Sequence, residues 1–303
     1  MSDGGLDARL GEVSGRTRAT LERLQRDVPT TIYHYTSGTA LRGIVDSRRI
    51  WAGHLESFGD SGEILYAFGL VRHVLDQEAA RHRTGAQAEL ANRLRAALAP
   101  FSPYLEAYAA CFCEEGDLLT AWRAYGREGG VAIGLDTSFL ERRARTTPGY
   151  SLVRVIYDRA AQEELVRSTI AGALGALGEG EAREDAVSRC EGFVLAELTP
   201  AFASCKHPSL AEEREWRLVH AWAPGEAGLP VQFRRGSNGL TSYVELKVTD
   251  PAGIFDDRIP IHRFVAGPTA NPRQAAKTLA LFRYEHGYEG SAEIVRSAIP
   301  HGA

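Results

Sequence analysis

Hydrophobic residues in this chain follow two spacings, and the segments that carry them alternate irregularly along its length. Between residues 6 and 26, leucines and Val13 recur about every 3.6 residues among charged positions, which predicts an amphipathic N-terminal helix. Segments with the same spacing predict further helices at 37–47, 60–98 with a possible break at Gly85, 118–125, 163–198 with a glycine-rich middle at 172–180 that can form a loop, and 271–286.

A second set of segments is rich in β-branched and aromatic residues, which suit a pleated sheet. They predict strands at 31–36, 50–52, 108–113, 130–136, 152–157, 213–222, 231–235, 241–248, 261–267 and 292–297. Because the strands and helices lack a regular β-α-β alternation, the pattern favours an α+β fold over a parallel doubly wound sheet. We expect one domain over residues 29–303, with residues 1–28 as a helical appendage that packs on it.

Composition narrows the classes of function without choosing one. A hydrophobic content of 44% in 303 residues is enough for a sizeable core, and a net charge of -4 gives no overall basic field of the kind that dominates non-specific nucleic-acid binding. The first residues do not have the pattern of a secretory signal, so we expect a cytoplasmic protein that does not bind membranes. Four cysteines are too few for a disulfide framework, so reduced thiols and no metal site are expected.

Common catalytic motifs are missing from the sequence. It contains no Gly-Xaa-Gly-Xaa-Xaa-Gly after a strand, no Gly-Lys-Ser/Thr phosphate loop, no Gly-Xaa-Ser-Xaa-Gly and no His-Glu-Xaa-Xaa-His. These absences exclude the common nucleotide cradles, the serine hydrolase elbow and the zincins. A nucleotide bound in another way remains compatible with the sequence.

The richest candidate site is the segment 210–222. If it is a strand, Glu213, Glu215 and Arg217 share one surface, because side chains alternate between the two faces. A strand is favoured from Glu215 onward, where tryptophan, leucine and valine dominate, whereas the preceding residues can also be helical. An ordinary Glu–Arg pair on a solvated face is the simpler explanation. The functional interpretation is a catalytic carboxylate beside a second acid.

The predicted first strand offers an imidazole. His34 lies on the face opposite Tyr33 and Tyr35, where it could donate a hydrogen bond to a sugar hydroxyl or act as an acid or base. A core histidine bonded to a carbonyl is an equally good explanation. Asp60 and Glu63 could be polar groups of a site, but a helix N-cap followed by a first-turn carboxylate accounts for both and is preferred.

Two further features have a structural and a functional interpretation. Trp122 and Tyr125 are three positions apart on a short helix, a spacing that more often indicates core packing than a stacking platform. Cys113 could be a nucleophile, but no partner base is apparent and a buried thiol is the commoner case.

Several segments in sequence order resemble one bacterial family, the domain-of-unknown-function family "twenty-nine seventy-one". Each piece is weak, and their order and spacing over about residues 32–300 carry the resemblance. The pieces are Tyr33-His-Tyr-Thr36, the stretch 58–63, the stretch 110–126 running into 130–136, Val155-Ile-Tyr157, Lys206-His-Pro, Glu213-Arg-Glu-Trp-Arg217, Gly267-Pro268 and Ser297-Ala-Ile-Pro300.

That family has been grouped with the ADP-ribosyltransferase-like fold, so the resemblance implies a split antiparallel β-core with flanking helices and a cleft that holds NAD. It implies that His34 is the first-strand residue that fixes NAD, Glu215 the catalytic acid, and Glu213 the upstream acid of a Glu-Xaa-Glu pair. The middle strand departs from the family pattern, because Cys111-Phe-Cys113 stands where hydroxyl residues are expected. The residues expected to contact NAD are Tyr33, His34, Tyr35, Thr36, Cys113, Trp122, Tyr125 and Arg217.

The resemblance therefore implies an NAD-consuming enzyme that transfers ADP-ribose to an unknown acceptor, which could be a protein, a nucleic acid or a small molecule. Hydrolysis, with water as the acceptor, is a variant of the same chemistry. An inactive module that binds a nucleotide or a protein is the rival, favoured by the Cys111-Phe-Cys113 departure. Transfer of a phosphate-bearing group from RNA is less expected, because the first strands lack a basic cluster.

Overall fold

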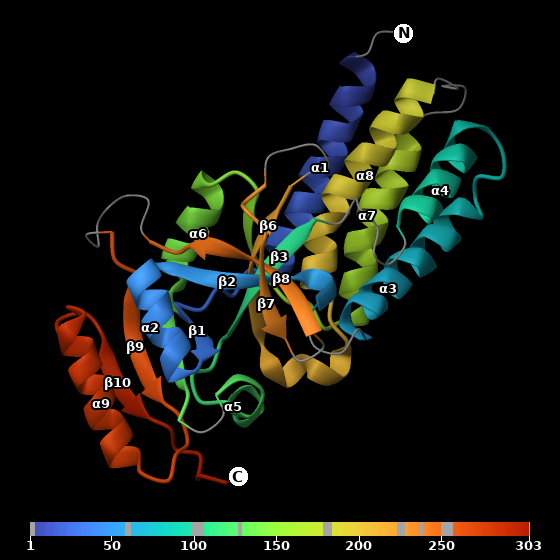
Figure 1. Ribbon diagram of the computed structural model, residues 1–303. Helices are drawn as coiled ribbons and strands as arrows, with labels where there is room; N and C mark the ends of the chain where they lie inside the picture. Colours follow the sequence, from blue (N-terminus) through green and yellow to red (C-terminus); the bar gives the residue numbers. More distant parts are fainter. Residues whose placement is uncertain are drawn as a thin grey trace.

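The strands predicted from the sequence join in one mixed sheet. The computed structural model describes residues 4–57, 62–98, 106–126, 129–177, 184–222, 228–236, 239–249 and 257–302. Within these ranges the fold is α+β, with a ten-stranded sheet and flanking helices (Figure 1). The strands are β1 Thr31–Thr36, β2 Arg49–His54, β3 Ala107–Cys113, β4 Val131–Asp136, β5 Tyr150–Arg154, β6 Glu215–Ala221, β7 Gln232–Gly236, β8 Gly239–Lys247, β9 Ile261–Ala266 and β10 Glu293–Arg296.

Strand β3 is the branch point of the sheet. One path runs β10-β9-β4-β1-β3-β2-β8-β7, while β6 pairs with β3 on its other edge and with β5 beyond. β6 pairs along all of β3, whereas β1 meets it only at Cys113 and β2 only near Ala109. The two halves of the sheet therefore separate along one edge of β3. The antiparallel expectation is wrong at one place, because β10 runs parallel to β9.

The helices lie on both sides of this sheet. They are α1 Gly4–Leu24, α2 Gly38–Ser47, α3 Gly62–Ala79, α4 Gly85–Ala97, α5 Leu119–Tyr125, α6 Thr137–Thr146, α7 Arg159–Leu177, α8 Glu184–Ser204 and α9 Pro272–Glu285, with 3-10 turns at Leu55–Ser57 and Pro208–Glu213. Helices α1, α3, α4, α7 and α8 form a bundle, and α2, α6 and α9 lie toward the other end of the molecule (Figure 1). None of the helices in the described part of the chain combines the length and apolarity needed to cross a membrane.

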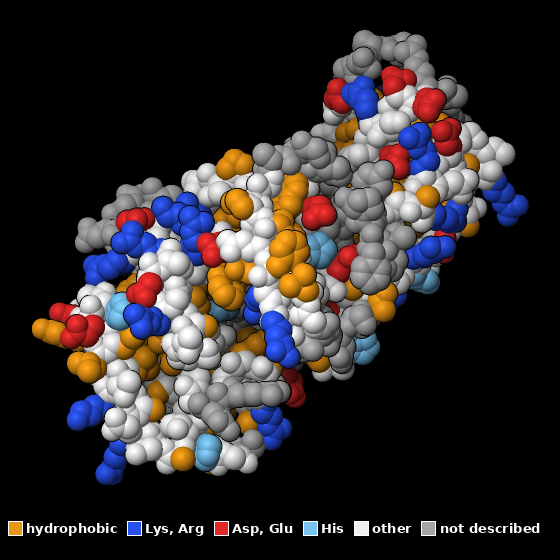
Figure 2. All heavy atoms as spheres, in the orientation of Figure 1, with side chains coloured by type: hydrophobic (Ala, Val, Ile, Leu, Met, Phe, Trp, Pro, Cys, Tyr) orange, Lys and Arg blue, Asp and Glu red, His pale blue; other side chains and the backbone are white. Residues whose placement is uncertain are grey.

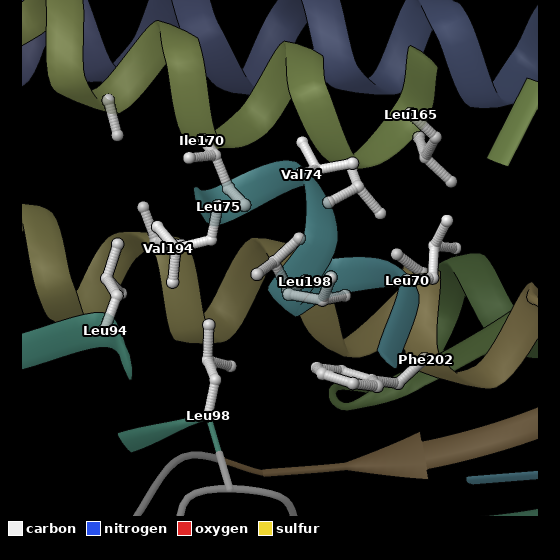
Figure 3. Close-up of a cluster of buried hydrophobic side chains, with 14 of the residues drawn as sticks. Leu70, Val74, Leu75, Leu94, Leu98, Leu165, Ile170, Val194, Leu198 and Phe202 are labelled. Carbon is white, nitrogen blue, oxygen red and sulfur yellow. The ribbon is translucent and has the colours of Figure 1, made fainter. Parts of the chain in front are cut away.

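Two large cores stabilise the fold. The bundle buries leucines, valines and Phe202 between its helices (Figure 3), and this core continues onto Ala107, Ala109 and Val219 of the sheet. The second core lies on the other face of β3 and β6 and includes Phe112 and Trp216. Because successive strand residues point to opposite faces, β3 and β6 contribute side chains to both cores.

Most sequence-predicted elements are present, and the differences have local causes. The predicted helix 60–98 is two helices, because the chain turns at residues 80–84 and Gly85 adopts a φ of 83°. Residues 172–177 of the predicted glycine-rich loop are helical, because α7 continues to Leu177, and the rest of that loop lies outside the described residues. Within the helix, a Cβ at Gly172 would come within 2.6 Å of Val13 in α1. Asp60, the predicted helix cap, lies outside the described residues.

Candidate functional site

The first residue of β6 lies where four segments of the chain meet. The 3-10 turn Pro208–Glu213 ends at Arg214, which has a left-handed backbone with φ 42° and ψ 54°. This turn redirects the chain into β6, which begins at Glu215. The predicted strand therefore starts at Glu215, and Glu213 precedes it on the 3-10 turn. The two acids converge through this turn.

Glu215 is almost wholly buried, with 4% of its surface exposed, and two cations hold it. Lys206 Nζ donates to its Oε2 over 2.8 Å. Arg217 Nε donates to its Oε1 over 2.7 Å, and Arg217 Nη2 donates to Oε2 over 3.2 Å. The thiol of Cys111 also donates to this carboxylate. Lys206 and Arg217 together bring donors to both oxygens of the carboxylate.

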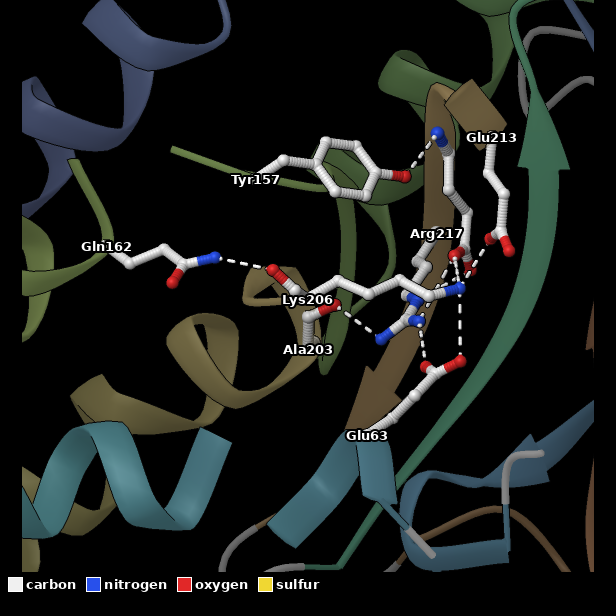
Figure 4. Close-up of polar contacts among 8 residues, drawn as sticks. Glu63, Tyr157, Gln162, Ala203, Lys206, Glu213 and Arg217 are labelled. Carbon is white, nitrogen blue, oxygen red and sulfur yellow. Dashed lines mark hydrogen bonds and ion pairs between the residues drawn. The ribbon is translucent and has the colours of Figure 1, made fainter. Parts of the chain in front are cut away.

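Two more carboxylates complete an acid–base cluster formed by Glu63, Lys206, Glu213, Glu215 and Arg217 (Figure 4). Lys206 Nζ lies 2.5 Å from Glu213 Oε2 and 3.1 Å from Glu63 Oε1. Arg217 Nη2 lies 3.0 Å from Glu63 Oε2. The preferred capping interpretation missed this role of Glu63, which projects from the first turn of α3 into the cluster. Three carboxylates against two cations leave one negative charge in excess.

The charges of the cluster set its protonation. Burial alone would raise the pKa of Glu215, but Arg217, Lys206 and the hydrogen bonds that it accepts lower the pKa to about 2. Burial would lower the pKa of Lys206, yet Glu215 and Glu63 raise it above its ordinary value. Glu215 is therefore a carboxylate and Lys206 an ammonium ion at neutral pH.

Backbone contacts fix the two ends of the Lys206–Glu215 pair. The hydroxyl of Tyr157 accepts a hydrogen bond from the Glu215 N–H over 3.1 Å. Gln162, which is fully buried, donates to the carbonyl oxygens of Lys206 and Ile156 over 2.7 and 2.6 Å. Sequence reasoning did not single out Gln162 or Lys206 as site residues, although Lys206 is one of only three lysines in the chain.

A small pocket lies beside the cluster. It has a volume of about 50 Å³, enough for a few water molecules. Tyr33 and Tyr35 of β1 and Tyr125 of α5 contribute phenol rings to it, and Glu213 and Glu215 line it from the cluster side. We call this the tyrosine pocket; its remaining lining residues are Cys111, Cys113, Thr120, Ala121 and Ala124.

One register row crosses this pocket. Tyr33 is paired with Cys113 across β1 and β3, and Cys113 is paired with Glu215 across β3 and β6. Cross-strand partners point to the same face, so these three side chains project together toward the pocket. Tyr125 is 59% exposed overall, while burial of its phenol end and the nearby Cys111 and Glu215 raise its pKa. It therefore spans from the pocket to solvent.

His34 does not lie in this pocket, so the expectation that it shares a hollow with Glu215 is wrong. It is adjacent to Phe112, with ring centroids 5.6 Å apart, and it therefore faces the core that contains Trp216. Its Nδ1 lies 2.9 Å from the carbonyl oxygen of Cys111, and burial lowers its pKa. Strand alternation is the reason, because His34 and Tyr33 must point to opposite faces.

The other predicted contacts divide between the pocket and its surroundings. Trp122 is buried behind the pocket, where its ring meets the edge of Tyr35 at 4.6 Å and its Nε1 donates to Asp117 over 2.7 Å. Thr36 is buried on the same strand face as His34 and does not line the pocket. Arg217 lies in the cluster, as its shared strand face with Glu215 predicted.

The cysteines of β3 are protonated thiols. Burial, together with the charge of Glu215, raises the pKa of Cys113 to about 12 and also raises that of Cys111. Thiolate is the nucleophilic form of cysteine, so these shifts disfavour Cys113 as a nucleophile. No two of the four cysteines, all of which lie in the described residues, form a disulfide.

A larger cavity, of about 600 Å³, lies at the far end of β6 between that strand and α8. Its charged lining residue is Glu191, which accepts a hydrogen bond from Arg93 Nε over 2.8 Å. No member of the acid–base cluster lines it. Among the described residues, no group of three or more His, Cys, Asp or Glu side chains is arranged to hold a metal ion.

Comparison with known proteins gives one match. Residues 121–218 match the model of a family described as "Protein of unknown function (DUF2971)". The matched region runs from α5 to β6 and contains four members of the cluster, all except Glu63. This match supports membership of the family that the sequence resembles. Searches of curated proteins and of solved structures found no match.

Proposed function

We propose that this protein consumes NAD, cleaving the nicotinamide–ribose bond and transferring ADP-ribose to an acceptor. The observation that carries the proposal is the row of Tyr33, Cys113 and Glu215 across three adjacent strands. The resemblance implies this order of a first, a middle and a late strand for an ADP-ribosyltransferase-like core. The separation of the sheet along one edge of β3 supports the same kinship.

The charge and shape of the tyrosine pocket suit the nicotinamide ring of NAD. That ring is a pyridinium cation, and the acid–base cluster beside the pocket has one negative charge in excess. Tyrosine faces attract cations, and Tyr33, Tyr35 and Tyr125 provide three phenol rings. A volume of about 50 Å³ is below the roughly 300–1,000 Å³ of most ligand pockets and below the roughly 150 Å³ of a cavity that binds benzene. Entry of the nicotinamide ring therefore requires the pocket to widen.

Glu215 has the protonation state that the chemistry needs. As the carbon–nitrogen bond breaks, nicotinamide leaves with the electron pair and positive charge develops on the ribose carbon. A carboxylate that accepts a hydrogen bond from the ribose 2′-hydroxyl stabilises this charge. The thiol of Cys111 is the weakest of the present donors to Glu215, so we expect the ribose hydroxyl to take its place.

Glu213 suits the second half of the reaction. Its side chain is 33% exposed, whereas that of Glu215 is nearly buried, so Glu213 is the acid that an incoming acceptor meets. The acceptor oxygen or nitrogen forms the new bond to the ribose carbon, and its proton passes to Glu213 or to solvent. If water is the acceptor, the same arrangement gives an NAD glycohydrolase. Four cysteines with no disulfide between them suit a reducing compartment such as the cytoplasm.

A second candidate function is a binding module without turnover. The observation that favours it is that Lys206 and Arg217 already donate to both oxygens of Glu215, with the Cys111 thiol beside them. A cluster of this kind can simply brace the fold. Cysteines in place of hydroxyl residues on β3 favour the same alternative.

Nicotinamide release from NAD tests the proposal. Purified wild-type protein is compared with Glu215→Gln and with Glu212→Gln, which makes the same change on an exposed neighbouring acid. Loss of a well-placed electrostatic group typically lowers a rate about a hundredfold or more, so we expect release to fall that far in Glu215→Gln and to be unchanged in Glu212→Gln.

The other outcomes are also informative. NAD binding by calorimetry without nicotinamide release supports the binding module. If a folded wild-type protein neither binds NAD nor releases nicotinamide, the NAD-consuming enzyme and a module that binds NAD are both contradicted. Labelled NAD incubated with a cell lysate then separates transfer, which labels an acceptor, from hydrolysis, which yields free ADP-ribose.

A further inference from the structure

One face of strands β2, β8 and β7 combines aromatic and basic side chains. The pairs Arg49↔Lys247 and Trp51↔Glu245 place these four residues side by side across β2 and β8. Tyr243 follows on the same face of β8, two positions from Glu245. On β7, Arg234 is paired with Thr241 and so continues this face. We call the group Arg49, Trp51, Arg234, Tyr243 and Lys247 the aromatic–basic face.

The aromatic residues of this face form a platform. The rings of Trp51 and Tyr243 lie 4.5 Å apart at 34°, and the guanidinium of Arg234 lies 5.8 Å from the Trp51 ring centre. Trp51 is 50% exposed, an unusual surface for so large a ring, whereas Tyr243 is 7% exposed and lies buried against it. Figure 2 shows hydrophobic and basic side chains over the position that β7 and β8 occupy in Figure 1.

Basic residues lie at both ends of the platform. Arg49 and Lys247 are at one end. The backbone of Arg234 is about 20 Å away, six residues along the paired strands at about 3.3 Å per residue, and its guanidinium reaches back to 5.8 Å from the Trp51 ring centre. Acids near the face offset part of this charge, because Glu245 lies 3.9 Å from Arg49, and Asp257 lies 3.4 Å from Lys247 and also pairs with Arg48. Arg48, Arg49, Arg234 and Lys247 against these two acids leave the face with a net positive charge.

We propose that the aromatic–basic face binds single-stranded nucleic acid. An exposed aromatic ring on which a base stacks, flanked by cations that follow the phosphates, is a combination that such surfaces use, and Trp51 provides the exposed ring here. The charge complementarity is local, and it is compatible with a net charge of -4 for the whole chain. The proposal does not depend on NAD chemistry, because none of these residues belongs to the acid–base cluster or the tyrosine pocket.

Two other occupants fit the face less well. A protein partner would be expected to cover the apolar side chains on the reverse of the same hairpin, where Leu240 is 77% exposed, but an apolar contact does not need the cations. An anionic membrane would favour an apolar hairpin end, whereas the last pair of β7 and β8 is Gly236↔Gly239, which has no side chains to insert. The alignment of Arg234 over Trp51 favours a ligand that offers a flat ring and a negative charge together.

Fluorescence anisotropy with a labelled oligothymidine or oligouridine of about a dozen nucleotides tests the proposal. We expect binding that weakens as salt rises and that falls roughly tenfold in Trp51→Ala. Arg234→Gln should weaken binding and reduce the slope against salt by about one. Tyr284→Ala is the matched control, because it removes a 63% exposed aromatic ring from α9 and should bind as the wild type does.

Several results would overturn this assignment. The first is no binding to either oligonucleotide at low salt. The second is an equal loss of oligonucleotide affinity in Trp51→Ala and Tyr284→Ala. The third is equal affinity for duplex and single-stranded nucleic acid. Light scattering that shows a dimer lost in Trp51→Ala would assign the face to a second copy of the chain. Co-sedimentation with anionic vesicles, in the absence of oligonucleotide binding, would assign it to a lipid surface.

Discussion

Lys206 and Glu215 form a buried ion pair, in which Lys206 Nζ lies 2.8 Å from Glu215 Oε2. The same ammonium group also contacts Glu63 and Glu213, so one lysine holds carboxylates from α3, the 3-10 turn and β6 together. After removal of this cation, Arg217 still contacts Glu215 and Glu63. The stability of the site therefore depends on Lys206 more than on any surface ion pair of the protein.

Lys206→Met should destabilise the fold by about 3–5 kcal/mol, because loss of one partner from a buried ion pair leaves an uncompensated charge. Urea unfolding at neutral pH measures the change. Arg42→Gln is the control, since it removes an exposed pair with Asp46 whose contribution should be below about 1 kcal/mol. A Lys206→Met protein within 1 kcal/mol of the wild type would show that Arg217 alone satisfies the acids.

Acid should weaken the fold through Glu215. Its pKa is lowered from 4.5 to about 2 in the folded protein, so its contribution is present above the unfolded value and is lost as pH falls between the two. That shift corresponds to about 3 kcal/mol at neutral pH. Glu215→Gln should therefore be less stable than the wild type near pH 7, and the difference should shrink below about pH 4.5. A constant difference across this range would contradict the assigned pKa.

Cys113 should react slowly with thiol reagents. With a pKa of about 12, it is a thiolate in roughly one molecule in ten thousand at pH 8. We expect Ellman's reagent to label Cys113 only as fast as the protein opens, with rapid labelling in urea. Mass spectrometry identifies the labelled residue. Fast labelling of native Cys113 would mean that the thiol is accessible and activated, and it would reopen its role as a nucleophile.

Variants of β1 and α5 should show which face of the sheet binds NAD. Tyr125→Ala removes a ring from the tyrosine pocket and, under the proposed function, should weaken NAD binding roughly tenfold. His34→Gln should leave NAD binding nearly unchanged and cost about 1 kcal/mol of stability, because His34 Nδ1 contacts the Cys111 carbonyl. Calorimetric titration with NAD and urea unfolding measure both effects. The reverse pattern would place NAD on the His34 face.

Local sequence patterns predicted the elements well but predicted their spatial relations poorly. The alternation in Tyr33-His-Tyr-Thr36 placed His34 on the face opposite Tyr33, and that much is confirmed. Which of the two faces carries the site depends on the register of β1 against β3 and β6, and the sequence of β1 does not contain that information. The family resemblance pointed to His34, whereas the register places Tyr33 and Tyr35 at the pocket.

The acid–base cluster shows the same limit. Glu215 and Arg217 were expected together because they are two apart on a strand. Glu63 lies in α3 and Lys206 lies just after the end of α8, so only the folded chain brings them together. The preference for a helix-capping role at Glu63 followed from a local rule. Long-range contacts of this kind decide the chemistry of the site.

A matched pair of glycines in α7 tests the packing of α1. Gly175 has open space around it, so Gly175→Ala should stabilise the protein by up to about 1 kcal/mol through the higher helix propensity of alanine. Gly172→Ala has the same propensity gain, but the new Cβ would lie 2.6 Å from Val13 Cγ1. Overpacking of this kind costs about 1–3 kcal/mol, so Gly172→Ala should destabilise the protein overall.

Thermal or urea unfolding of the two variants measures this difference, and a double substitution identifies its cause. Val13→Ala removes the methyl groups that Gly172→Ala would meet, so the double variant should lose less stability than the two single changes predict together. The combination therefore reports directly on contact between α1 and α7. If Gly172→Ala and Gly175→Ala stabilise the protein equally, then α1 does not pack closely on α7 in solution, and the appended helix contributes little to the core of the bundle.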